Sequence, residues 1–124
     1  MIVGLDHVQL AAPVGGEGRA RTFYGELLGL AELSKPPGLA ARGGVWFALG
    51  PHQQLHIGVE TQFVAARRAH AALMVDSRAA LEALAAGLAR RGHEPRWDTD
   101  LPGARHFHVD DPFGNRVELL VCEQ

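Results

Sequence analysis

The order of predicted elements along this chain occurs twice, and this repeat restricts the fold more than any other feature. Residues 5–12 (LDHVQLAA) alternate between apolar and polar side chains, as a half-buried strand does. Residues 19–29 (RARTFYGELLG) place apolar side chains at helical spacing and end on a glycine. Three more strands are predicted at 30–34, 45–50 and 55–60.

The second half of the chain repeats this order. A strand at 69–76 precedes a helix that Ser77 can cap and Gly92 can end, and a short strand at 94–97 leads to a hairpin at 105–121. A βαβββ unit cannot bury both its sheet face and its helix alone, so two copies are expected to assemble. The repeat therefore predicts an α+β fold in a single domain, 1–124, with its parts at 1–61 (module one), 62–68 (linker) and 69–124 (module two).

Composition excludes several classes of protein. The chain is 47% hydrophobic and 21% charged, which is ordinary for a globular domain. A formal net charge of -2 gives no electrostatic reason to expect nucleic acid as a partner. The N-terminus lacks a basic signal-peptide region, no apolar run is long enough for a membrane span, and one cysteine excludes an internal disulfide. We therefore expect a cytoplasmic protein with no nucleic-acid partner and no membrane partner.

The hairpin places polar groups on a face that should be buried. Pro112 to Gly114 suit a three-residue loop, because proline presets the first turn position and glycine accepts the left-handed one. Counting outward then pairs His108 with Glu118 and puts His106 on the same face, since side chains alternate along a strand. Two imidazoles and a carboxylate thus share one side of the predicted hairpin.

Four stretches of sequence resemble the vicinal oxygen chelate superfamily, which includes glyoxalase I, bleomycin-resistance proteins and extradiol dioxygenases. The resemblance covers essentially the whole chain and rests on LDHVQL, FYGELLGL, the strand that holds His70, and DPFGNRVEL. It implies the glyoxalase/bleomycin resistance/dihydroxybiphenyl dioxygenase-like fold, in which the two modules form a curled mixed sheet whose concave face carries the ligands.

The resemblance also implies a metal site. The family's metal positions correspond to His7, His56, His70 and Glu118, although relatives usually have Glu or Gln where this chain has His56. Imidazole and carboxylate donors suit one divalent transition metal per site: zinc, nickel, cobalt, manganese or iron. His56 is predicted either to bind the metal itself or to contact a residue that binds it.

The resemblance also implies a small-molecule substrate. Other side chains on the same face are predicted to act on this substrate. Glu118 and His108 are the predicted catalytic residues, because either can accept or donate a proton beside the metal. His106, Gln9 and Trp46 are the predicted substrate-binding residues. Each is also a residue type that ordinarily packs in a strand without any role in binding.

Three functions remain open at this point. The preferred interpretation is a glyoxalase-like enzyme, an isomerase, epimerase or lyase, in which the metal chelates two substrate oxygens and a proton is transferred. The first alternative is an Fe²⁺ extradiol dioxygenase that uses the triad His7, His70 and Glu118. The second is a non-catalytic binding protein of the bleomycin-resistance type. In each case we expect a homodimer, because each module leaves sheet edges to cover.

Overall fold

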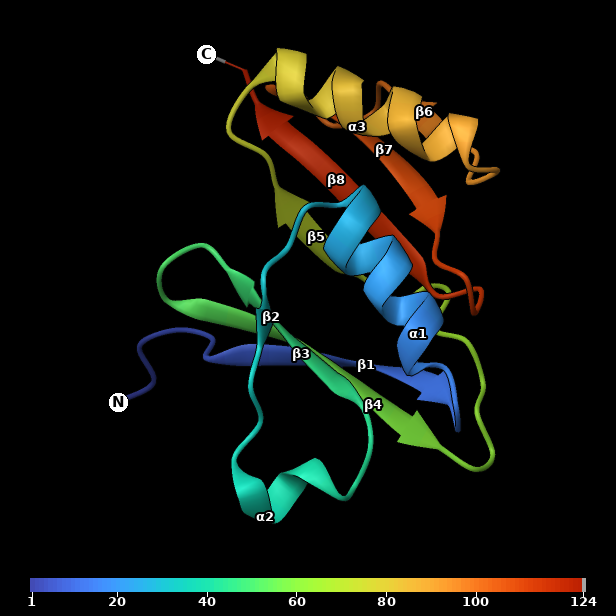
Figure 1. The fold of residues 1–124 in the computed structure, drawn as a ribbon. Helices are drawn as coiled ribbons and strands as arrows, with labels where there is room; N and C mark the ends of the chain where they lie inside the picture. Colours follow the sequence, from blue (N-terminus) through green and yellow to red (C-terminus); the bar gives the residue numbers. More distant parts are fainter. Residues whose placement is uncertain (124) are drawn as a thin grey trace. The chain divides into compact units, whose positions relative to one another are not determined.

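The computed structural model describes residues 1–123, which form two compact units (Figure 1). The first unit comprises residues 1–65 and the second begins at Ala66. The boundary thus falls inside the stretch predicted as the linker, 62–68. Each unit is a βαβββ module with one four-stranded mixed sheet, so the predicted α+β class and the module pair are confirmed. In residues 1–123, no helix combines the length and apolar character needed to cross a membrane.

The first module has the strand order β1-β4-β3-β2. β1 runs parallel to β4, and the other neighbours are antiparallel. Its elements are β1 (His7–Pro13), α1 (Glu17–Ala20), η1 (Arg21–Leu27), β2 (Glu32–Leu33), α2 (Pro37–Ala40), β3 (Val45–Leu49) and β4 (Gln53–Glu60).

The first helix differs from the one predicted at 19–29. It begins at Glu17, because a turn closed by the bond from Gly16 N to Pro13 O brings the chain into the helix early. From Arg21 it continues as a π-helix, in which Leu28 N donates to Phe23 O, five residues back. α2 lies in a Pro/Gly-rich stretch that the sequence predicts as loop.

The second module has the order β5-β8-β7-β6. Its elements are β5 (Ala71–Met74), α3 (Arg78–Arg90), β6 (Arg96–Asp98), β7 (Ala104–Asp110) and β8 (Arg116–Cys122). α3 lies along one face of this sheet (Figure 1). Ser77 caps the helix as predicted, because its Oγ accepts from Ala80 N at 3.1 Å. β5 is shorter than the strand predicted at 69–76, so His70 lies directly before it.

The predicted hairpin register is confirmed. His108 pairs with Glu118 across β7 and β8, and Gly114 adopts the left-handed conformation with a φ of 91°. Asp111 holds the loop closed: its Oδ1 accepts from the backbone N–H groups of Phe113 and Asn115, each at 2.9 Å. The loop therefore fixes which side chains of the two strands share a face.

Alternation along the strands separates an apolar face from a polar face in each module. In the second module Phe107, Val109, Val117 and Leu119 are buried on the same side as Leu81 of α3. In the first module the buried apolar side of β3 and β4 comprises Val45, Phe47, Leu55 and Ile57. The opposite faces carry the histidines.

A pair of glycines holds the loop before β3 against β4. Gly44 has a φ of +86°, and its N–H donates to Glu17 Oε2 at 3.0 Å. A Cβ at this position would lie 2.4 Å from the carbonyl oxygen of Ile57, a backbone atom that β-pairing holds in place. Only glycine fits this backbone conformation and this close approach.

We expect Gly44→Ala to lower the free energy of unfolding by about 1–3 kcal/mol, because strained φ and a backbone clash act together. Gly38→Ala is the control, since nothing lies within 4 Å of a Cβ there. Urea denaturation of both variants measures the difference. Equal stability of the two variants would contradict this account of the loop.

Candidate metal and substrate site

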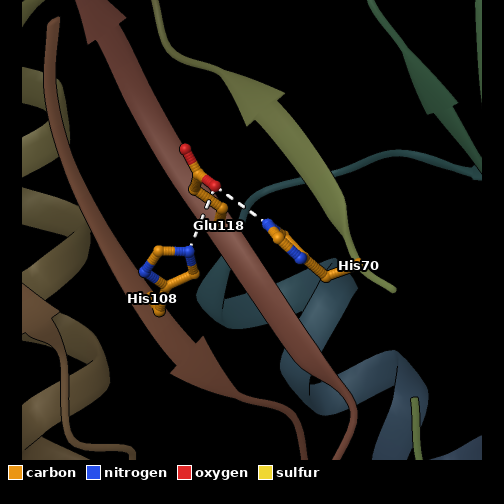
Figure 2. A group of neighbouring side chains, drawn as sticks. All are labelled: His70, His108 and Glu118. Atoms are coloured by element: carbon orange, nitrogen blue, oxygen red, sulfur yellow. Dashed lines mark hydrogen bonds and ion pairs between the residues drawn. The ribbon is translucent and has the colours of Figure 1, made fainter. Parts of the chain in front are cut away.

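Three side chains of the second module converge on one carboxylate oxygen (Figure 2). His70 Nε2 lies 2.9 Å from Glu118 Oε1, and His108 Nε2 lies 3.1 Å from the same oxygen. One ligand atom from each residue lies within 4.8 Å of the other two. Glu118 has only 12% of its side chain exposed, so the carboxylate is largely removed from water. The group therefore brings together two imidazoles and a carboxylate, which are donor types that divalent transition metals accept.

The ring of His70 is held in a defined orientation by the backbone. Its Nδ1 lies 2.9 Å from the carbonyl oxygen of Arg68, which can only accept a hydrogen bond, so Nδ1 carries the proton. When the ring is neutral, this leaves the lone pair on Nε2, which faces Glu118. A backbone carbonyl that orients a histidine in this way is the usual support of a metal-binding imidazole.

His106 is a buried residue that contacts the second carboxylate oxygen of Glu118. It is 3% exposed, its Nδ1 lies 3.2 Å from Glu118 Oε2, and its Nε2 lies 3.2 Å from Asp100 Oδ1. Nδ1 forms no hydrogen bond of good geometry, so its contact with Glu118 is mainly electrostatic. Asp98, Asp100 and His106 also bring three possible ligand atoms together, but both aspartates are exposed.

The pKa values of this group reflect its contacts. Burial acts to raise the pKa of Glu118, but the hydrogen bond from His70 and the charges of His108 and His106 outweigh burial, and the net pKa is lowered. The pKa of His70 is raised, first by the bond to the Arg68 carbonyl and then by Glu118. The two shifts share a cause, because the contact between His70 and Glu118 favours the charged form of each.

The polar face of the first module carries a stack of three rings. Trp46 lies on His56 with 4.0 Å between ring centroids and 3° between ring planes, and His7 lies on the other side of His56 at 4.2 Å and 17°. His56 is buried, and its Nε2 lies 2.8 Å from Gln54 Oε1. Burial, followed by the charge of His7, lowers the pKa of His56, which favours the neutral ring. His7 Nδ1 lies 2.9 Å from Asp6 Oδ2.

The predicted site residues thus fall into one group in each module. The structure brings His70, His108, His106 and Glu118 together in the second module. In the first module it brings together His7, His56, Trp46 and Gln9, with Gln9 paired to His56 across β1 and β4.

Two basic residues near the first group were missed by sequence reasoning. Lys35 and Arg42 line the same cavity as Trp46, although they lie in a stretch predicted as loop. Lys35 is the only lysine in the chain, and this was the one signal that the sequence offered.

Comparison with known proteins identifies the family and supports the fold. The sequence model of the Glyoxalase/Bleomycin resistance protein/Dioxygenase superfamily matches residues 4–119. A glyoxalase family protein from Bacillus anthracis has 46% sequence identity and a TM-score of 0.91, with 99% of this chain and 98% of that chain covered. A comparison with curated proteins finds no match.

More distant structures share the fold. A lactoylglutathione lyase from Agrobacterium tumefaciens has 20% identity and a TM-score of 0.76, with 98% of this chain and 95% of that chain covered. An antibiotic-binding protein from a Streptomyces species, TnmS3, has 23% identity and a TM-score of 0.75, with 98% of both chains covered. The match over residues 4–119, together with the 46% identical relative, shows that this chain belongs to the Glyoxalase/Bleomycin resistance protein/Dioxygenase superfamily.

Proposed function

We propose that the protein is a divalent-metal-dependent enzyme that acts on a small, oxygen-chelating substrate by proton transfer. The observation that carries this proposal is the convergence of His70 Nε2, His108 Nε2 and Glu118 Oε1. A largely buried carboxylate surrounded by imidazoles is costly to maintain without a further role, and a cation offsets that cost.

The residues fit such a metal in donor chemistry and in spacing. Donors about 2.1 Å from one ion lie roughly 3.0–3.4 Å from each other, depending on geometry. The separation from Glu118 Oε1 to His108 Nε2, 3.1 Å, falls in this range, and the one to His70 Nε2, 2.9 Å, is that of a direct hydrogen bond and slightly shorter. Nitrogen and oxygen donors suit zinc, nickel, cobalt, manganese or iron, and do not choose among them. His7 and His56 stay predicted ligands.

Proton transfer falls to the chain's own side chains. A bound divalent cation supplies Lewis-acid polarisation of the substrate oxygens. When His70 and Glu118, with the predicted ligands of the first module, hold the metal, His108 is suited to move the proton, because its side chain is 21% exposed and a substrate can reach the ring. Glu118 is the other candidate base. His106, behind Glu118, can hold the carboxylate in place, because it contacts Glu118 Oε2 and leaves Oε1 to the other two histidines.

Two alternatives have support of their own. The triad predicted for an Fe²⁺ dioxygenase is His7, His70 and Glu118. In the second module His108 offers a second histidine beside His70 and Glu118, and two histidines with one carboxylate are the donor set of non-haem iron oxygenases, which supports catechol cleavage. A binding protein is supported by the fold shared with the antibiotic-binding protein TnmS3 and by a cavity in the first module. Metal content separates the binding protein from both enzymes.

Protein purified without chelator or affinity tag is expected to hold about one divalent metal per site. His70→Ala and Glu118→Ala are each expected to lower metal content at least tenfold, since loss of one ligand weakens the rest of the set. Elemental analysis after dialysis measures this. His52→Ala is the matched control, because His52 lies in an exposed turn and its loss removes an imidazole elsewhere. Full metal retention by His70→Ala would reject the site.

The same preparation tests the ligands predicted from the first module. His7→Ala and His56→Gln are compared by X-ray absorption, which counts imidazoles around the metal. Loss of one imidazole in His56→Gln would support a four-ligand site and Lewis-acid chemistry. An unchanged count would exclude His56 as a ligand and favour the iron dioxygenase.

We also propose a homodimer. Each sheet has two edge strands, β1 and β2 in the first module and β5 and β6 in the second. Met74, on β5, is 76% exposed, and an exposed apolar side chain on an edge strand favours pairing with another chain. Sedimentation at micromolar concentration is expected to give twice the monomer mass of 13.3 kDa. A monomer with bound metal would reject the dimer.

Stability of the metal-free protein should depend on pH through His70 and Glu118. The raised pKa of His70 gives a stabilisation that is complete below its ordinary value of 6.5 and is lost as pH rises through the folded-state value. The lowered pKa of Glu118 gives one that is present above 4.5 and is lost as pH falls through the folded-state value. The pair is therefore most stabilising between these two ordinary values.

Urea denaturation of the wild type and His70→Gln tests this. The stability difference between the two proteins is expected to be largest near about pH 5.5 and smaller near about pH 8.5. It should stay below about 1 kcal/mol, because the pair is partly exposed. Comparing the two proteins cancels the opposite effect of His56, whose pKa is lowered. A difference that grows towards pH 8.5 would contradict the pairing.

A further inference from the structure

The first module contains a cavity of about 530 Å³, and two basic residues of its lining have no part in the proposed proton transfer. Trp46, His7 and His56 line it, and so do Lys35 and Arg42 from the segment between β2 and β3. Its volume lies in the range of small-molecule sites. The cavity therefore combines flat ring surfaces with two cations.

Trp46 and His7 end a stack of three rings, so each keeps one flat face outside the stack. Trp46, His56 and His7 are stacked nearly parallel on adjacent strands, at centroid separations of 4.0 and 4.2 Å. Trp46 remains partly exposed, so part of its ring is available to a ligand. Stacked rings favour a planar body, because offset stacking adds to the free energy gained by burying apolar area.

One of the cations is held in place by the backbone. The ammonium group of Lys35 donates to the carbonyl oxygen of Gly43. Gly44 fixes that carbonyl, because it is bonded to Glu17 and packed against Ile57. The side chain of Lys35 therefore loses less conformational entropy on binding an anion than an unrestrained lysine would lose.

The charges of the two cations are only partly offset by carboxylates. The pKa of Glu17 is lowered first by the hydrogen bond from Gly44 and also by the charges of Arg21 and Lys35, so Glu17 acts on Lys35. In residues 1–123, neither Lys35 nor Arg42 forms an ion pair with an acidic side chain. The acidic residue that lines the described cavity, Asp6, lies 2.9 Å from His7 instead. The lining of the cavity therefore holds two cations, Lys35 and Arg42, against one carboxylate, Asp6. This excess of positive charge favours a ligand with an oxyanion.

We propose that this cavity binds a small planar compound with one oxyanion, a carboxylate or a phosphoryl group. Lys35 and Arg42 hold the oxyanion, and Trp46 holds the planar body. The inference rests on the proposed function only in taking this ligand to be the enzyme's substrate. The binding itself requires neither metal nor catalysis.

The test uses the full chain, freed of metal by chelator and labelled with ¹⁵N. Benzoate, phenylphosphonate and the neutral benzamide are titrated at low salt, and shifts are followed at the Trp46 indole and the Gly43 amide. At least one anion is expected to bind about tenfold more tightly than benzamide, and to weaken as salt rises. Comparison of benzoate with phenylphosphonate decides which oxyanion is preferred.

Variants assign the charge. Lys35→Gln and Arg42→Gln are each expected to weaken anion binding about tenfold and to leave benzamide unchanged, because a charge-assisted bond is lost. Arg42 is exposed, so Arg42→Gln is the variant that keeps the fold if Lys35→Gln disturbs the loop. Arg91→Gln is the matched control, since Arg91 is an exposed arginine at the end of α3.

Several results would overturn the proposal: equal affinity for benzoate, phenylphosphonate and benzamide, equal weakening in Arg91→Gln, shifts confined to the second module, or no binding by any probe at millimolar concentration.

Failure of anion binding is distinct from failure of the proposed function. Anion binding by a protein that takes up no metal would reject the metal enzyme and support the binding protein, whereas metal binding without anion binding would reject only this inference.

Discussion

The hairpin that joins β7 to β8 is the constraint on which the second module depends. Asp111 and Asn115 close its loop through side-chain bonds, and Asn115 Oδ1 also accepts from Ala66 N at 2.8 Å. A slip of one residue would turn every side chain of β8 to the other face, because strands alternate. It would exchange Glu118 with apolar neighbours such as Val117. The loop therefore secures both the core and the group around Glu118.

The two modules have equivalent strand orders, but they place different charged groups on their polar faces. The second module collects imidazoles around one carboxylate, and each contact lowers the cost of burying its charge. The first module stacks a buried histidine between rings and leaves two cations beside a cavity. A carboxylate among imidazoles suits a cation, and a cavity with cations suits an anion.

The fold alone leaves the reaction undecided, because relatives with this fold include a lactoylglutathione lyase and an antibiotic-binding protein. Particular atoms favour an enzyme, chiefly the Nε2 atoms of His70 and His108 that face Glu118 Oε1. His108 is central to it, since a single imidazole there can serve either as a ligand or as a proton carrier. These two roles distinguish the dioxygenase from the proton-transfer enzyme.

Local sequence patterns determined the module repeat, the cap at Ser77 and the pairing of His108 with Glu118, because alternation, capping and turn geometry act over a few residues. Two features were not predictable, since packing against neighbouring elements decides them: the π-helix at Arg21–Leu27 and the late start of β5, just after His70. Only the tertiary structure put Lys35 and Arg42 beside Trp46. They are brought there by a loop that Gly44 packs onto β4, and contacts between residues distant in sequence leave no periodic pattern to read.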